Sequence, residues 1–163
     1  MPLLLRKIRK SRWYKELAWL PEGDVQADSL GDLPTKGNKL SVWFIKENMS
    51  NLERVITALA ANCDSISNFD YALFSEEILK NETIKVEKSK GESKDGEAND
   101  EWHRDLCELS AKKMLYIAQH IFNEGKIERI QEKQIGQQIS NAVKTGTIKL
   151  AALKEGIRTK INI

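Results

Sequence analysis

The sequence predicts an α+β domain, or a small α/β domain, with a βαβ core in the N-terminal half and a helical C-terminal half. Two short apolar segments rich in β-forming residues, 40–45 and 69–74, enclose a stretch with helical periodicity. Apolar residues then recur at helical spacing from residue 103 onward. Since 40% of the 163 residues are hydrophobic, we expect a single domain spanning 1–163 with its own core.

The first 20 residues form a basic and aromatic N-terminal segment. Positions 6–16 hold six Lys or Arg against one acid, although the whole chain carries a net charge of only +2. That balance excludes a protein that is basic overall and leaves a local basic patch as a candidate contact surface. Such a patch suits an acidic protein surface, and it suits nucleic acid, because basic groups neutralise phosphates and aromatic rings stack on bases. The candidate contact residues are Arg6, Lys7, Arg9, Lys10, Arg12, Trp13 and Lys15.

Residues 21–39 are predicted to be an irregular connection, because they contain two prolines and three glycines. Asp24, Asp28 and Asp32 recur there at every fourth position. Calcium loops place their ligands at alternate positions and end on a glutamate, so this spacing does not match one. We interpret these aspartates as turn-forming and capping residues.

Residues 40–79 are predicted to be the βαβ core. Ser50 and Glu53 have the spacing of a capping box and mark the start of the helix between the strands. Strand, helix and strand within 35 residues match a right-handed crossover, so we expect two parallel, neighbouring strands. The apolar stripe of the helix consists of Leu52, Val55, Ile56, Leu59 and Cys63.

A small-molecule site in a parallel unit would lie beyond the carboxyl ends of its strands. No glycine-rich phosphate loop accompanies these strands, although the helix N-terminus near Asn51 could receive an anion. The candidate cleft residues are Lys46, Glu47, Asn48, Ser50, Ser75 and Glu76.

Residues 82–101 are predicted to be a charged, flexible insert, because Ile84 and Val86 are the only strongly apolar side chains among them. A metal-dependent nuclease would pair Asp70 with an E-x-K triplet such as Glu92-Ser-Lys94. Charged segments produce such triplets by chance, and a flexible insert would not hold this one rigidly. We therefore do not assign a nuclease site.

The region 103–163 is predicted to be helical, with helices over 103–123, 127–143 and 150–161. Gly125 and Gly146 follow the first two as helix stops. A helix-turn-helix motif would fit within 127–157, but the apolar pattern does not require the sharp crossing of its helices.

Metal binding is not expected, and the residues favour a non-catalytic protein. His103 and Cys107 are one helical turn apart, but neither a C-x-x-C nor an H-E-x-x-H pair accompanies them, and Cys63 belongs to the predicted core stripe. His120 is the only other histidine. We expect no metal and no cofactor, and two cysteines without a disulfide framework favour reduced thiols in the cytoplasm.

The favoured function is a non-catalytic protein-binding or accessory protein of a prokaryotic cell that acts through protein–protein contact. One alternative is a nucleic-acid-binding module that uses the N-terminal basic and aromatic residues. A second is a small enzyme with its site at the carboxyl ends of the strands. The apolar runs are far shorter than the roughly 20 residues that span a bilayer, so no membrane contact is expected.

Overall fold

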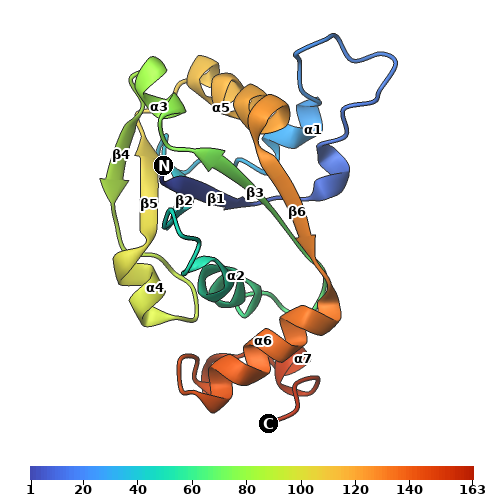
Figure 1. Ribbon diagram of the computed structural model, residues 1–163, viewed down its shortest axis with the longest axis vertical. Helices are drawn as coiled ribbons and strands as arrows, with labels where there is room; N and C mark the ends of the chain where they lie inside the picture. The colour runs from blue at the N-terminus through green and yellow to red at the C-terminus, as the bar shows by residue number, and fades with distance from the viewer.

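The computed structural model describes residues 1–163 and has a mixed α+β fold (Figure 1). Its centre is a six-stranded sheet with the order β4-β5-β2-β1-β3-β6, in which every adjacent pair is antiparallel. The strands are β1 (Leu3–Lys7), β2 (Leu40–Ile45), β3 (Phe69–Ser75), β4 (Lys85–Lys88), β5 (His103–Cys107) and β6 (Lys126–Ile130).

Helices cover both faces of the sheet, and each face has its own apolar core (Figure 1). One face lies under α2 (Leu52–Ala60), α4 (Gly96–Glu101), α6 (Glu132–Lys144) and α7 (Glu155–Arg158). The other lies under α1 (Ala27–Leu30), α3 (Ile78–Asn81) and α5 (Ala111–Glu124). Two 3₁₀ turns, Lys10–Arg12 and Leu150–Ala152, complete the regular structure.

The predicted strand–helix–strand unit is present, but the prediction that its strands are neighbours is wrong. β1 lies between β2 and β3 and pairs antiparallel with both, so these two strands run parallel without contacting each other. The physical reason is the apolar start of the chain. Leu4 and Leu5 are fully buried, one in each core, and a strand that is apolar on both faces is most stable at the centre of a sheet.

Helix α2 confirms the predicted helix between these strands, although its start differs from the prediction. Its N-cap is Asn51, and no side chain of the expected capping box bonds to the first turn. The Asn51 side chain instead accepts a hydrogen bond from the Lys46 amide at 2.9 Å and donates one to the Phe44 carbonyl at 2.9 Å. Asn51 therefore fastens the helix start to the end of β2.

The predicted flexible insert, 82–101, is wrong, because this segment contains β4 and α4. Asp95 is only 1% exposed and caps α4 by accepting a hydrogen bond from the Ala98 amide. Its carboxylate also accepts hydrogen bonds from the Arg54 guanidinium at 2.5 and 3.1 Å. The segment is thus ordered by specific partners on α2 together with the burial of Ile84 and Ala98 in the two cores.

The prediction that 103–163 is wholly helical is also wrong. Residues 103–107 form β5 and residues 126–130 form β6, whereas the helices that follow each strand are present as α5 and α6. The expected third helix is reduced to a 3₁₀ turn and the four residues of α7. None of the helices combines the length and the apolar composition that spanning a bilayer requires.

Candidate functional site

The N-terminal basic segment is organised around the buried carboxylate of Asp32. Oδ2 of this residue accepts hydrogen bonds from the Arg9 amide at 2.8 Å and from the indole Nε1 of Trp13 at 2.9 Å. Oδ1 accepts one from Nη1 of Arg12 at 2.9 Å. Trp13 is only 4% exposed, so its ring is part of the core and offers no face for stacking on a nucleobase.

Arg6 also has a structural position. Its Nε donates to the carbonyl of Asp32 at 3.1 Å, and its Nη1 donates to the carbonyl of Ser41 at 2.7 Å. Burial lowers the pKa of Arg6, and the Asp32 carboxylate opposes that shift. Arg6 therefore joins β1 to two other segments of the chain.

The remaining basic residues of the segment do not converge on one surface. Lys7 donates to Sγ of Cys63 at 3.0 Å, and its Nζ lies 5.6 Å from the centre of the Phe69 ring. Nζ of Lys15 lies 5.5 Å from the centre of the Phe122 ring. Arg9, Lys10 and Lys15 are exposed at the base of a loop, and Lys7 is exposed on β1. Of the seven candidate contact residues, the structure thus leaves these four on the surface.

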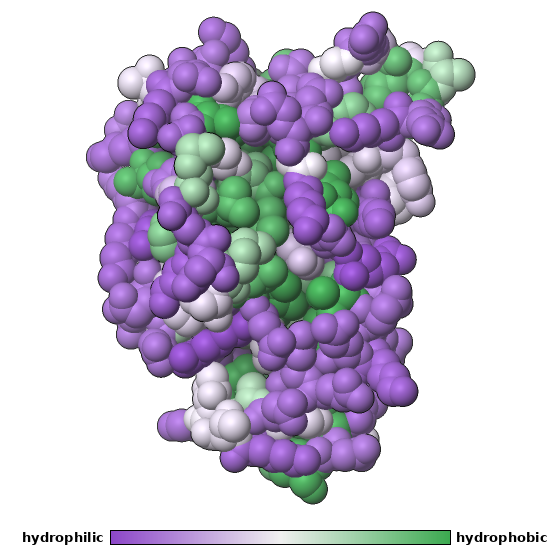
Figure 2. Space-filling view, in the orientation of Figure 1, coloured by the Kyte–Doolittle hydropathy of each residue, from purple (hydrophilic) through white to green (hydrophobic).

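Residues 14–24, which we call the projecting loop, begin within this segment and extend beyond it. The loop extends away from the sheet between the first 3₁₀ turn and α1 (Figure 1). Trp19 is 69% exposed and Tyr14 is 59% exposed, and Figure 2 shows apolar surface where the loop projects. Sequence reasoning did not assign Trp19 to the site, and the signal for its exposure is the turn-forming Pro21 and Gly23 that follow it.

Both ends of the projecting loop are fastened to the core. Trp13 precedes it and the buried Val25 follows it. Gln26 Nε2 donates to the Tyr14 carbonyl at 3.2 Å, which bridges the two ends. Inside the loop, one turn is closed by Leu20 N to Leu17 O at 3.0 Å and a second by Asp24 N to Pro21 O at 3.1 Å. Gly23 adopts φ +78°, a conformation that favours glycine.

The charge of the projecting loop changes between its base and its tip. Residues 16–24 contain Glu16, Glu22 and Asp24 and no basic residue. The base carries the exposed cations named above. The acidic residues of the loop are thus within five positions of Trp19 in the sequence, whereas the cations lie at the base.

The candidate cleft at the strand ends is not assembled as one site. The start of β1 lies between the ends of β2 and β3, where the amino group of Met1 pairs with Glu47 at 2.5 Å and the Glu76 amide donates to Pro2 O at 3.4 Å. Ser50 and Ser75 line two different hollows, and Nζ of Lys46 lies 5.7 Å from the centre of the Trp102 ring. The Asn48 side chain accepts from the Ser50 amide at 3.1 Å and so serves its own turn.

His103 is held in a network of hydroxyl groups. Its Nε2 lies 2.5 Å from Oγ of Ser41, and its Nδ1 lies 2.9 Å from Oγ and 3.3 Å from the carbonyl of Ser89. A carbonyl can only accept, so Nδ1 carries the proton and Nε2 accepts from Ser41. Burial lowers the pKa of His103, which Asp105 opposes. This neutral histidine ties β2 and β5 to the segment after β4.

The other residues considered for metal chemistry have separate partners. Arg129 forms a bidentate ion pair with Asp70, donating from Nε to Oδ1 at 2.7 Å and from Nη2 to Oδ2 at 3.0 Å. These hydrogen bonds lower the pKa of Asp70. Burial raises the pKa of Cys107. The structure contains no group of three or more His, Cys, Asp or Glu side chains arranged to hold a metal ion.

Comparison of this chain with protein-family models, with curated proteins and with solved structures found no match. Function is therefore inferred from the residues of this chain alone.

Proposed function

We propose that this chain is a non-catalytic binding or accessory protein that acts through protein–protein contact, with the projecting loop as its contact surface. The observation that carries the proposal is the 69% exposure of Trp19 on a loop whose ends are both anchored. Tryptophan and tyrosine are the residues most enriched at the energetic centres of protein interfaces, where each buries a large area against a partner.

The anchoring of the loop favours binding. Ordering a loop upon association costs free energy, and that cost is smaller when the loop is already ordered in the unbound protein. The two internal turns and the bridge from Gln26 to Tyr14 supply this order. The indole of Trp19 is thereby presented without a large entropic penalty on binding.

The charge of the loop favours a protein over nucleic acid at this surface. A base stacked on Trp19 would bring its phosphates close to Glu16, Glu22 and Asp24, where like charges repel. A protein surface has no such constraint. The partner that fits best has an apolar pocket for the indole, basic side chains around that pocket, and acidic groups placed to meet Lys10 and Lys15 at the base of the loop.

The proposal is tested by affinity capture from a nuclease-treated lysate of the source cells, with quantitative mass spectrometry. Wild type is compared with Trp19→Ala and with Leu150→Ala, a matched control that removes another exposed apolar side chain, itself 42% exposed. We expect one or a few proteins to bind the wild type and Leu150→Ala and to be lost with Trp19→Ala. With the purified partner, Trp19→Ala should weaken binding by about 30-fold or more, equivalent to about 2 kcal/mol.

Two outcomes would contradict the proposal. In one, the captured proteins do not change between Trp19→Ala and the control. In the other, wild type captures nucleic acid through the loop before nuclease treatment and no protein after it. Self-association through the loop would appear as concentration-dependent sedimentation that Trp19→Ala abolishes, and would identify a second copy of the chain as the partner.

A further inference from the structure

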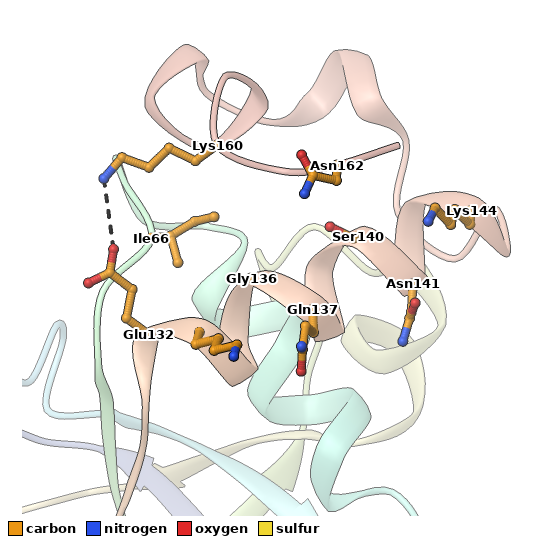
Figure 3. Close-up of a pocket in the computed structure, with 10 residues that line it drawn as sticks. Ile66, Glu132, Gly136, Gln137, Ser140, Asn141, Lys144, Lys160 and Asn162 are labelled. Carbon is orange, nitrogen blue, oxygen red and sulfur yellow. Dashed lines mark ion pairs between the residues drawn. The ribbon is translucent and has the colours of Figure 1, made fainter.

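A second surface lies at the opposite end of the molecule, between α6 and the last residues of the chain. We call this hollow the α6 groove. Its volume is about 780 Å³, and α6 supplies most of its lining. Figure 3 shows the helix along one side, the tail with Lys160 and Asn162 along the other, and Ile66 from a neighbouring loop between them. The residues that line it include Ile66, Glu132, Lys133, Gly136, Lys144 and Lys160.

The α6 groove is cationic. Lys133 and Lys144 line it without forming an ion pair, and Lys160 is only loosely paired with Glu132, at 3.9 Å (Figure 3). The surrounding part of the chain, residues 131–163, has six Lys or Arg against two Glu, although the whole chain has a net charge of only +2. This end of the protein therefore carries a local excess of positive charge, as the N-terminal segment also does, and such an excess attracts anions.

The floor of the α6 groove is left bare by Gly136. A Cβ atom at this position would meet only side-chain carbons of Ile66, at 3.7 and 3.9 Å, which is ordinary contact. Packing within the protein therefore does not require glycine here, and glycine weakens a helix interior relative to alanine. What glycine provides is space, because no side chain extends from this half-buried position of α6 into the groove.

The opposite wall of the α6 groove, formed by the C-terminal tail, is packed against the core. Ile157 and Ile161 are buried in the same core as the inner face of α6, and Lys154 pairs with Asp64. At Gly156 a Cβ atom would lie 2.5 Å from the Asp64 carbonyl, so the tail packs there as closely as its backbone allows. The groove is thus built before any ligand enters it.

The arrangement of the lysines indicates a chain of phosphates rather than a single anion. Lys133 and Lys144 are eleven residues apart on α6, which is about 16 Å along a helix. Successive phosphates of one strand are spaced by about 3.4 Å along a duplex, so this length spans several of them. The amide groups of Gln137 and Asn141 between the lysines can donate to phosphate oxygens. No aromatic side chain lines the groove, so it offers no platform for stacked bases.

We propose that the α6 groove binds the phosphodiester backbone of nucleic acid, without a requirement for sequence. This activity is independent of the projecting loop and adds a second function to the protein. It also differs from a nucleic-acid site in the N-terminal segment, because none of the basic residues of that segment lines the groove.

The experiment measures fluorescence anisotropy of a labelled 20-base-pair duplex of arbitrary sequence, titrated with the full chain between about 50 and 200 mM salt. The double variant Lys133→Gln with Lys144→Gln is compared with Lys10→Gln with Lys15→Gln, which removes the same charge from exposed lysines of the N-terminal segment. Log affinity decreases with log salt, and we expect Lys133→Gln with Lys144→Gln to make this decrease shallower by about 2 in slope. Lys10→Gln with Lys15→Gln should leave the slope unchanged.

A third variant removes no charge. Gly136→Gln places a side chain in the floor of the α6 groove, and we expect affinity to fall at least tenfold while the melting temperature does not fall. Trp19→Ala should bind the duplex like wild type, which separates this proposal from the protein contact. A single strand titrated in parallel shares the phosphodiester backbone, and the same pattern of losses on it would also support the proposal.

The proposal is overturned by any of three results. Wild type does not bind the duplex at about 50 mM salt, where electrostatic binding is strong. The two double variants lose affinity equally, which would assign binding to general surface charge. Gly136→Gln folds and binds like wild type, which would place the nucleic acid outside the groove.

Discussion

The indole nitrogen of Trp13 and the carboxylate of Asp32, nineteen residues apart in the chain, form a buried hydrogen bond of 2.9 Å. Around this bond the backbone of Arg9 and the guanidinium of Arg12 also donate to Asp32. One carboxylate thus fixes the chain immediately before the projecting loop. The N-terminal segment thus supports the projecting loop, which we propose as a contact surface.

This relationship predicts the effect of Trp13→Phe on stability. The substitution keeps an aromatic ring and removes the donor, so a charged acceptor is left with one hydrogen bond fewer in a buried site. We expect a loss of about 1–3 kcal/mol in the free energy of unfolding, measured by urea denaturation. Trp19→Phe, on the exposed tip, should change it by less than about 0.5 kcal/mol. Similar losses in the two variants would show that the contact with Asp32 does not stabilise the fold.

His103 predicts a pH dependence of stability. Burial lowers its pKa below the value of about 6.5 that it has in the unfolded chain. On acidification the unfolded state therefore takes up the proton first, and the free energy of unfolding decreases from about pH 6.5 down through the lower pKa of the folded state. His103→Gln should be less stable at neutral pH and should lack this part of the decrease. Urea denaturation at a series of pH values checks the difference, and two parallel pH profiles would contradict it.

Asp95 tests whether the charged segment is part of the architecture. Asp95→Ala removes the cap of α4 and leaves the Arg54 guanidinium without its closest acceptor. We expect a loss of more than about 2 kcal/mol in the free energy of unfolding, combining the cap with the hydrogen bonds to a charged group. Asp100→Ala, whose exposed carboxylate is 3.9 Å from Lys90, should have almost no effect in the same denaturation series. If Asp95→Ala also leaves the free energy of unfolding unchanged, the segment is not anchored through α2.

Two glycines predict opposite responses to alanine. Gly136→Ala should raise the free energy of unfolding by about 0.5–1 kcal/mol, because its Cβ meets nothing closer than 3.7 Å and helix propensity improves. Gly156→Ala should lower it by about 1–3 kcal/mol, because its Cβ would lie 2.5 Å from a backbone oxygen. Thermal melts of the two variants show whether each substitution raises or lowers the stability of the protein. Destabilisation by Gly136→Ala would mean that the fold itself requires glycine in α6.

Local sequence patterns predicted the features of this protein that depend on nearby residues. The apolar periodicity of α2 and the helix stops at Gly125 and Gly146 follow from contacts within a few positions along the chain. The mixed α+β class follows from the same information, since strand and helix propensities are local. The concentration of basic and aromatic residues in the first 20 positions is likewise visible in the sequence.

Pairing between strands that are distant in the sequence decided where each strand lies in the sheet. β5 has a polar composition, HRDLC, and becomes a strand because β2 and β4 pair with it on either side. β1 separates β2 from β3 because its leucines are buried in both cores. No local pattern contains these partners, so propensity alone assigned 103–107 to a helix and 82–101 to a flexible insert.

The candidate sites show the same division. The sequence by itself determined which residue types are present: basic and aromatic side chains near the N-terminus, and lysines with amides near the C-terminus. Only the tertiary structure decided that Asp32 withdraws Trp13 and Arg12 into the fold while Trp19 stays exposed, and that the chain end lies along α6 to form a groove. The physical reason is that a buried carboxylate takes the donors that reach it in space, whatever their separation in sequence.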